Sequence, residues 1–278
     1  MLQEEILLQM VAQERQFMPR VGGRVLLELI KGKLPPHLVP GRDKFFDVLR
    51  AHKLLVKRRR LRATTTDSNH WLRKYPNLIK GFCPVAAHQL WVSDITYIRI
   101  GGDFAYLSLI TDGYSRKIIG WALGDTLEAK HSVKALKMAL RQLPKDKKGV
   151  YHHSDRGVQY CSEEYVKILK KKKFQISMTE SGDPLDNAIA ERINGILKDG
   201  WLNDIQFRTI DEARKKISEV IRIYNTRRPH SSINMLTPEK AHLMQGELKR
   251  LWKNYYKYTY GNLLINSEKD DGDPAKRW

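Results

Sequence analysis

The sequence predicts an α/β protein, with a mixed five-stranded sheet flanked by helices and a small helical unit in front of it. Two patterns predict this class. Residues 90–122 contain three runs rich in β-branched and aromatic residues, separated by short turns with Gly and Asp. Behind them, helical and strand-like patterns alternate, which is typical of strands covered by helices. No internal repeat is visible, so one sheet accounts for the pattern.

The helical unit is expected over residues 1–62. An opening helix runs through Gln16, a second covers residues 25–30, and a third begins at Asp43, a good N-cap residue. Prolines and glycines break the chain between these helices, and the basic run KRRR at residues 57–60 follows. Short helices with such breaks and a basic exit predict a helix-turn-helix-like DNA-binding region. A basic run taken alone is also typical of a solvated linker.

Behind this unit we expect a loosely packed linker at 63–84, the α/β core at 85–245, and a basic, aromatic extension and tail at 246–278. The order of elements in the core is that of the ribonuclease-H-like fold, although order alone leaves other α/β folds open. Strands are predicted at 90–100, 104–111, 117–122, 150–153 and 174–178, and helices at 127–143, 162–172, 184–201 and 211–224.

The charge of the chain favours a polyanionic partner. Its 50 Lys and Arg against 31 Asp and Glu leave a net charge of +19, and 17 of the basic residues against 7 of the acidic ones lie before residue 81. This balance favours nucleic acid, although ribosomal proteins and proteins of anionic membrane surfaces are also basic. Two cysteines are too few for a disulfide framework. Without a signal-peptide pattern or a long apolar run, we expect a cytoplasmic protein that joins the nucleoid when bound to DNA.

Asp94 is the first candidate functional residue, because it lies midway in a strand that is apolar on both faces. Its neighbours include Trp91, Val92, Ile95 and Ile98. A strand of this kind is normally central and buried. An ionised carboxylate there is costly unless it is paired or bound to a cation. The residues alone favour two interpretations equally. Either Arg or a backbone N–H pairs with Asp94, or Asp94 binds a ligand.

Asp155 is the second candidate, because it follows a short apolar strand in HHSDRGVQY. Ligands of α/β sheets bind in the loops beyond the carboxyl ends of strands. Asp-Arg-Gly is also a common turn, so a backbone role is equally open. Asp112, in an Asp-Gly pair between two strands, is assigned such a turn role only.

Glu191 is the third candidate, and its helix sets its direction. With Asp183 as N-cap and Pro184 as first helical residue, apolar residues fall on one side of the helix. The other side carries a narrow polar stripe, Asn187, Glu191, Asn194 and Lys198. A solvated helix face would look the same, so the stripe shows only that Glu191 and Lys198 point the same way.

These three carboxylates lie on a central strand, at the end of a neighbouring strand and on a following helix. Such a set can hold two Mg²⁺ ions, with Mn²⁺ as a substitute, for an in-line phosphoryl transfer. Carboxylates are hard oxygen ligands that offset the charge of the ions and leave positions open for phosphate and water.

Five motifs in order make the sequence resemble the OrfB transposases of bacterial insertion sequences, in the integrase branch of the DDE superfamily. The resemblance covers residues 21–238, and 35 residues separate Asp155 from Glu191, which is the spacing of that family. The motifs are WVSDITYI, TDGYSRKIIGW, HSDRGVQY, SGDPLDNAIAERINGILK and YNTRRPHSSINMLTP. The resemblance implies that Asp94, Asp155 and Glu191 are the metal ligands and that Lys198 contacts DNA near the reacting phosphate.

Further residues receive weaker predictions. Asn187, beside Glu191, is a candidate for orienting a ligand or DNA, and Arg228 for holding phosphate or capping the core. His153 and His230 lie in what the sequence presents as polar loops, and a positioning role is favoured for both because imidazole serves Mg²⁺ poorly. The basic run is predicted to contact DNA phosphates through its four side chains, Lys57, Arg58, Arg59 and Arg60.

The resulting hypothesis is a transposase that cleaves a phosphodiester at the end of an insertion sequence and joins the freed 3′ hydroxyl to target DNA. Two rivals stay open: a ribonuclease-H-like nuclease that cuts without joining, and a DNA-binding regulator with an inert core. The expected partners are the terminal inverted repeats, target DNA and further copies of the chain. The resemblance adds an upstream OrfA protein, or a fusion with it, as a candidate partner.

Overall fold

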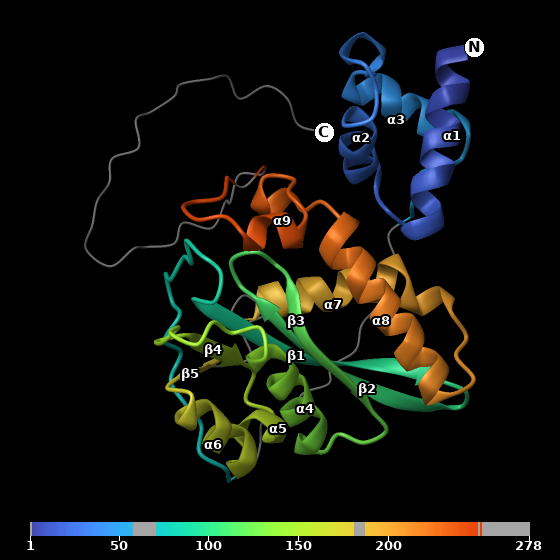
Figure 1. Cartoon of the computed structure of the whole chain (residues 1–278). Coiled ribbons are helices and arrows are strands. Elements are labelled where there is room, and N and C mark those ends of the chain that lie inside the picture. Colours follow the sequence, from blue (N-terminus) through green and yellow to red (C-terminus); the bar gives the residue numbers. More distant parts are fainter. Residues whose placement is uncertain (1, 58–70, 181–186, 250, 252–278) are drawn as a thin grey trace.

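One mixed sheet of five strands, in the order β3-β2-β1-β4-β5, forms the centre of the molecule (Figure 1). The computed structural model describes residues 2–57, 71–180, 187–249 and 251. The strands are β1 (Leu90–Ile100), β2 (Asp103–Asp112), β3 (Ile118–Gly124), β4 (Tyr151–Ser154) and β5 (Gln175–Met178). The helices of the core are α4 (Ala129–Leu140), α5 (Val158–Cys161), α6 (Glu163–Lys171), α7 (Ala188–Gly200), α8 (Ile210–Arg227) and α9 (Pro238–His242).

The first three strands form an antiparallel meander, whereas β4 and β5 join it in parallel. Strand β1 is therefore central, with β2 antiparallel on one side and β4 parallel on the other. This position explains its sequence, because a strand with neighbours on both sides and helices on both faces is apolar throughout. The mixed five-stranded sheet predicted from the sequence is confirmed.

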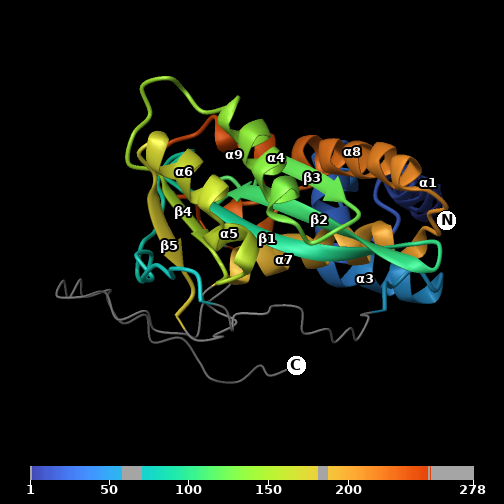
Figure 2. The same ribbon diagram turned by 90° about the horizontal axis from the view of Figure 1, so that it is seen from below.

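Two apolar clusters cover the two faces of the sheet. One contains α4, α5 and α6 packed on residues such as Trp91 and Ile110. The other contains α7 and α8 packed on residues such as Ile98 and Leu107. Figure 2 shows α4 and α7 on opposite sides of β1. Since side chains alternate along a strand, even-numbered residues of β1 face the α7 side.

The N-terminal unit consists of α1 (Leu2–Phe17), α2 (Gly23–Lys31) and α3 (Arg42–Ala51), which lie together at one side of the core in Figure 1. Their apolar residues belong to the same cluster as those of α7 and α8. Polar contacts add to this packing: the Trp201 indole N–H donates to the Phe17 carbonyl at 2.7 Å, and the Arg227 guanidinium lies 3.9 Å from the centre of the Phe17 ring. The unit is thus fixed against the ends of α7 and α8.

Two sequence predictions about this part of the chain are wrong. Helix α3 begins at Arg42 with Gly41 as N-cap, so Asp43 lies inside the first turn. The predicted loose linker is closely attached where the structure describes it, because Leu72, Tyr75 and other apolar residues up to residue 82 pack on the core. The Ser177 hydroxyl also accepts the N–H of Leu78 at 2.8 Å, which ties this segment to β5.

Other parts of the chain differ from the sequence prediction or lie outside the described residues. Short 3₁₀ turns that the sequence did not predict occur in the described part of the chain at Pro36–Leu38, Leu202–Asp204 and Ser231–Ile233. Most of the predicted extension at 246–278 lies outside the described residues. The domain boundaries therefore stay a prediction. Among the described helices, none is long and apolar enough to cross a membrane.

Candidate active site

Asp94 and Asp155 are brought together by the register of two parallel strands. The pairing of β1 with β4 ends at Ser93 opposite Ser154, and the next residues in each chain are Asp94 and Asp155. Neighbouring strands lie about 4.8 Å apart, and paired residues of parallel strands point to the same face. For Asp94 this is the face that α7 covers. The two carboxylates therefore meet where β4 ends.

The loop after β4 turns sharply to carry Asp155. The Asp155 carboxylate accepts the N–H of Gly157 at 3.1 Å, an Asx-type contact that fixes the side chain at the strand end. A Cβ atom on Gly157 would come within 2.9 Å of the Gln159 amide and 3.1 Å of the Asp155 carboxylate. The turn role that the sequence left open for Asp155 is thus present, and it holds the carboxylate beside Asp94.

Part of the polar stripe of α7, its two asparagines, lies over β1 and is shielded from solvent. The Asn194 amide donates to the Asp94 carboxylate at 2.6 Å, and the Asn187 amide donates to the Ser93 carbonyl at 3.2 Å. Both asparagines are nearly buried, at 5% and 6% exposure. Helix α7 begins at Ala188 with Asn187 as N-cap, while the predicted cap at Asp183 lies outside the described residues. Glu191, on the same stripe, is exposed beside this contact.

Electrostatics link the three carboxylates. Burial first, and then the negative charges of Asp155 and Glu191, raise the pKa of Asp94 from 3.8 to about 7, against the lowering effect of hydrogen bonds from Asn194 and the Ile95 backbone. Burial and then Asp155 raise the pKa of Glu191. The three acids therefore repel one another. A site of this kind is at its most favourable with a cation between the carboxylates.

Lys198 lies close to the same carboxylates. Burial lowers its pKa, whereas the charges of Asp199 and Asp94 act in the opposite direction. Its ammonium group is therefore half-withdrawn from water and within the field of Asp94. The predicted direction of Lys198, on the same side of α7 as Glu191, agrees with this placement.

Divalent ions fit the donor set that these residues offer. Carboxylate oxygens are the ligands that Mg²⁺ and Mn²⁺ prefer, and the buried Asp94 accepts a hydrogen bond from a neutral amide, which leaves its charge without compensation. Across residues 2–57, 71–180, 187–249 and 251, no three His, Cys, Asp or Glu side chains already stand at metal-binding spacing. The β1–β4 register fixes two of the three proposed ligands, Asp94 and Asp155. The exposed side chain of Glu191 would complete the ligand set.

His153 does not lie in a polar loop, contrary to the sequence prediction. It belongs to β4, its exposure is 0%, and its Nδ1 atom lies 2.8 Å from the Ser177 hydroxyl of β5. The neighbouring His152 lies 2.8 Å from the hydroxyls of Ser93 and Tyr165 on the opposite face. Burial lowers the pKa of His152 to about 3, so this histidine is neutral. Side-chain contacts of these two histidines thus connect β1, β4 and β5 in the residues that precede Asp94 and Asp155.

His230 and Arg228 lie in the segment that follows α8. His230 lies in the loop between α8 and the 3₁₀ turn at Ser231–Ile233, as predicted, but its ring is only 6% exposed and packs edge-on against Tyr224 at 5.2 Å. Burial, together with the charges of Arg228, Arg116 and Arg192, lowers its pKa well below the usual value. Arg228 follows α8 and donates to the Pro229 carbonyl at 3.3 Å. Lys57 is exposed, and Arg58, Arg59 and Arg60 lie outside the described residues.

Two residues of the site received no role from the sequence. Asn194 was assigned to the polar stripe, and its contact with Asp94 became visible only when α7 was placed on β1. Tyr160, on α5, is fully buried, and burial followed by the charges of Asp155, Tyr165 and Asp94 raises its pKa. Its hydroxyl has no hydrogen-bond partner among the described residues. No spacing rule in the sequence predicts that the Tyr160 side chain is buried near the loop that carries Asp155.

Comparisons with known proteins agree with this geometry. Two family models described as "Integrase core domain" match residues 84–184 and residues 172–238. The chain is 38% identical over 213 residues to an uncharacterized 31 kDa protein of insertion element IS600 from Shigella sonnei, a match that covers 74% of this chain and 78% of that one. It is 33% identical over 196 residues to the transposase InsF for insertion sequence IS3A from Escherichia coli strain K12, with 69% and 67% covered.

A solved structure shows the same fold over most of the chain. It is a chain of the simian T-cell lymphotropic virus intasome in complex with PP2A regulatory subunit B56 gamma, with a TM-score of 0.51 and 16% identity, covering 87% of this chain and 80% of that one. The sheet with flanking helices is therefore a ribonuclease-H-like integrase core. The family models and the two insertion-sequence relatives identify the family: the chain belongs to the IS3-type DDE transposases of insertion sequences.

Proposed function

We propose that this transposase cuts a DNA strand at the end of an insertion sequence and joins the freed 3′ hydroxyl to target DNA, with Asp94, Asp155 and Glu191 as ligands of divalent ions. The observation that carries the proposal is the cluster of three acids around Asp94, whose carboxyl is withdrawn from water. Beyond the effect of burial, Asp155 and Glu191 raise the pKa of Asp94, and Asp155 raises that of Glu191, which is unfavourable for stability alone; such clusters occur where a cation is bound.

When bound, a pair of Mg²⁺ or Mn²⁺ ions supplies charge stabilisation and an activated hydroxyl for an in-line phosphoryl transfer. The chain provides the surroundings for that chemistry. Asn194 holds the Asp94 carboxylate in one orientation through its amide. Lys198 offers a partly buried ammonium group that can bind a phosphate oxygen of the DNA strand beside the carboxylates. The fixed β1–β4 register keeps Asp94 and Asp155 in place while DNA enters.

The proposed partners are the terminal inverted repeats, target DNA and further copies of the chain on DNA. An OrfA protein, supplied separately or as a fusion, is a further candidate. The strong positive charge of the chain supports the DNA partners, since 50 Lys and Arg stand against 31 Asp and Glu. The N-terminal helices, Lys57 and the following three arginines are proposed to contribute to DNA binding.

The test is a joining assay with Mg²⁺. A labelled duplex that ends in the pre-cleaved tip of the insertion sequence is incubated with the transposase and a plasmid. The proposal predicts a labelled plasmid product with wild type and none with Asp155→Asn, because the loss of one ligand charge weakens the metal site. Binding of the duplex by Asp155→Asn in EDTA is the folding control.

Each alternative function gives a different result in this assay. Shortened label without a plasmid product would mean a nuclease that cuts without joining. Binding with neither product in wild type would mean a DNA-binding regulator. Either result contradicts the proposed joining activity.

A further inference from the structure

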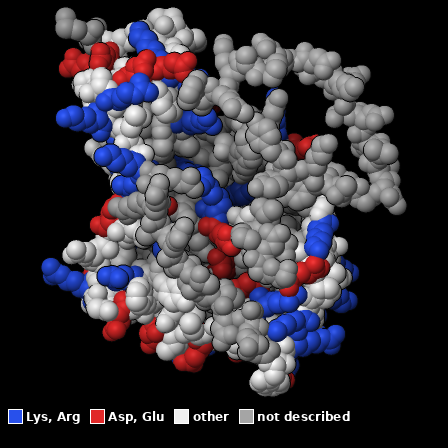
Figure 3. Space-filling view, turned by 180° about the vertical axis from the view of Figure 1, so that it is seen from behind, with Lys and Arg blue, Asp and Glu red and all other residues white. Residues whose placement is uncertain are grey.

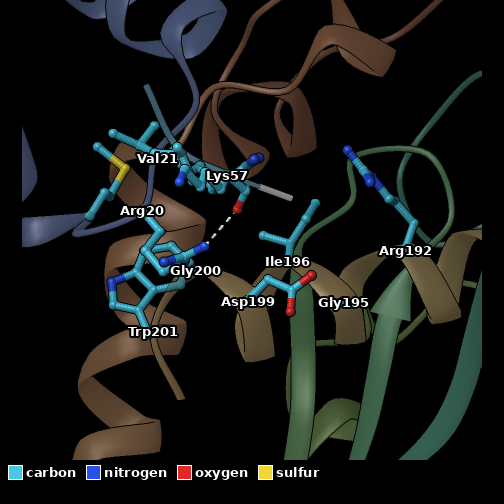
Figure 4. A pocket seen from close by; sticks show the side chains of 12 residues that line it. Arg20, Val21, Lys57, Arg192, Gly195, Ile196, Asp199, Gly200 and Trp201 are labelled. Carbon is cyan, nitrogen blue, oxygen red and sulfur yellow. Dashed lines mark hydrogen bonds between the residues drawn. The ribbon is translucent and has the colours of Figure 1, made fainter. Parts of the chain in front are cut away.

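A second, positively charged site lies beside α7, in a pocket between the core and the N-terminal unit (Figure 4). Its volume is about 190 Å³. The walls come from the connection between α1 and α2, the segment after α3, the outer side of α7, and the residue after α8. The charged residues among those that line it are Arg20, Lys57, Arg192, Asp199 and Arg228.

The charges of this pocket are unbalanced. Four basic side chains line it against the single acid Asp199. In Figure 4, Arg20 and Arg192 stand at opposite ends, and the Arg20 guanidinium donates to the Lys57 carbonyl at 2.8 Å. Burial, with a further contribution from Arg192, lowers the pKa of Arg228 to about 10. Arg20 pairs with Asp204 at 3.9 Å, whereas among the described residues neither Arg192 nor Arg228 has a carboxylate within 4.0 Å, so these two guanidinium groups lack a compensating anion.

The pocket adjoins the carboxylates along α7. Gly195, in the pocket wall, is four residues after Glu191 and three before Lys198, which makes it their neighbour on the helix surface. One helical turn rises about 5.4 Å, and a DNA strand rises about 3.4 Å per nucleotide, so the pocket lies within a few nucleotides of the carboxylates. In Figure 3, Lys and Arg side chains lie near the centre of this face, and Asp and Glu side chains lie next to them.

Gly195 also leaves room for a bulky ligand. A Cβ atom added at this residue would meet no atom of the described residues within 4 Å, so the described part of the chain leaves the helix surface open there. A DNA strand can therefore lie against α7 between Glu191 and the N-terminal unit. The occupant must be anionic, extended and able to contact several cations at once, and a sugar-phosphate backbone has all three properties.

We propose that this pocket binds backbone phosphates of the same DNA strand whose reacting phosphate lies at the carboxylates, so that α7 and the N-terminal unit clamp the strand together. The inference rests on the proposed function for the identity of the reacting phosphate. It assigns Arg20, Lys57, Arg192 and Arg228 to the DNA interface of the catalytic core.

The first test measures how salt weakens DNA binding. The probe is a fluorescein-labelled DNA duplex of random sequence, titrated in EDTA and followed by fluorescence anisotropy. The double variant Lys57→Ala/Arg192→Ala removes two exposed side chains, so the fold should be unaffected. Each lost phosphate contact should reduce the slope of log affinity against log salt by about 0.9, and therefore the pair by about 1.8.

The control removes the same charge elsewhere. Lys170→Ala/Lys171→Ala changes two exposed residues at the end of α6, which packs on the opposite face of the sheet. We expect this variant to keep the wild-type slope, and Lys57→Arg/Arg192→Lys to restore it. An equal loss of slope in the pocket and control variants would overturn the proposal. Because EDTA removes divalent ions, this result is independent of the joining assay.

The second test locates the DNA. Gly195→Cys, in a Cys83→Ser background, is labelled with a photoreactive azidophenacyl group, since Cys161 is buried. Illumination with the random-sequence duplex should give a protein–DNA crosslink that Lys57→Ala/Arg192→Ala reduces several-fold. The same label on Lys171→Cys should give background crosslinking. Equal crosslinking from both labelled positions would contradict a strand bound along α7.

Discussion

Asp94→Asn is expected to stabilise the metal-free transposase while removing its response to Mg²⁺. Burial and two neighbouring acids raise the pKa of Asp94 from 3.8 to about 7. A carboxyl whose pKa is raised by folding destabilises the folded state as pH rises above 3.8, and the full penalty is reached above about 7. At pH 8 the neutral amide removes that penalty, so the free energy of unfolding should rise by an amount on the order of 4 kcal/mol.

Urea denaturation in EDTA measures this effect, and the gain should shrink as the pH is lowered from 8 toward 5. Added Mg²⁺ should then stabilise wild type, because it binds the folded state, and leave Asp94→Asn unchanged. The matched control is Asp112→Asn. The Asp112 carboxylate is also fully buried but accepts hydrogen bonds from the N–H groups of His88, Tyr114 and Ser115, so its loss should destabilise. If Asp94→Asn were less stable than wild type at pH 8, the claim that the Asp94 charge is uncompensated in the metal-free protein would be contradicted.

Divalent-ion affinity is expected to rise steeply with pH and to level off above about pH 7. Protons and metal ions compete for the same carboxylates, and the Asp94 carboxyl holds its proton up to about pH 7. Below that pH the affinity should fall by about tenfold per unit, since one proton must leave before the metal binds. The raised pKa of Glu191 acts in the same direction.

Calorimetric titration with Mn²⁺ between pH 5.5 and pH 8 checks this dependence, with the proton release followed in buffers of different ionisation enthalpy. Release of about one proton per site near pH 6 is expected, and little release at pH 8. An affinity that is constant over this range would show that Asp94 is already ionised in the metal-free protein.

Much of the fold was predictable because its signals are local. The central strand was recognisable from apolar residues on both faces, and β1 has the predicted bounds, Leu90–Ile100. Asp94 was suspect for the same reason. Asp155 was less distinct, because an aspartate before Arg-Gly is also a turn residue. Only the β1–β4 register, which no local pattern encodes, brings it beside Asp94.

What could not be predicted depends on packing between distant segments. The polar stripe of α7 had the same composition as a solvated face, and Asn194 gained its contact only from the placement of α7 on β1. His153 was given a polar-loop position although it lies at the end of the strand predicted at 150–153, and in the structure its Nδ1 atom lies 2.8 Å from the Ser177 hydroxyl inside the sheet. The pocket beside α7 joins residues as far apart as Arg20 and Arg228, which no sequence pattern could bring together.

The most direct test of the central claim is the joining activity of Glu191→Gln. Glu191 is exposed on α7, so the amide preserves the size of the side chain and should not disturb the fold. The variant is assayed with a pre-cleaved end of the insertion sequence, a target plasmid and either Mg²⁺ or Mn²⁺, and its binding to the same end is measured in EDTA. We predict binding with wild-type affinity and no joined product, and joining at the wild-type rate would contradict the claim.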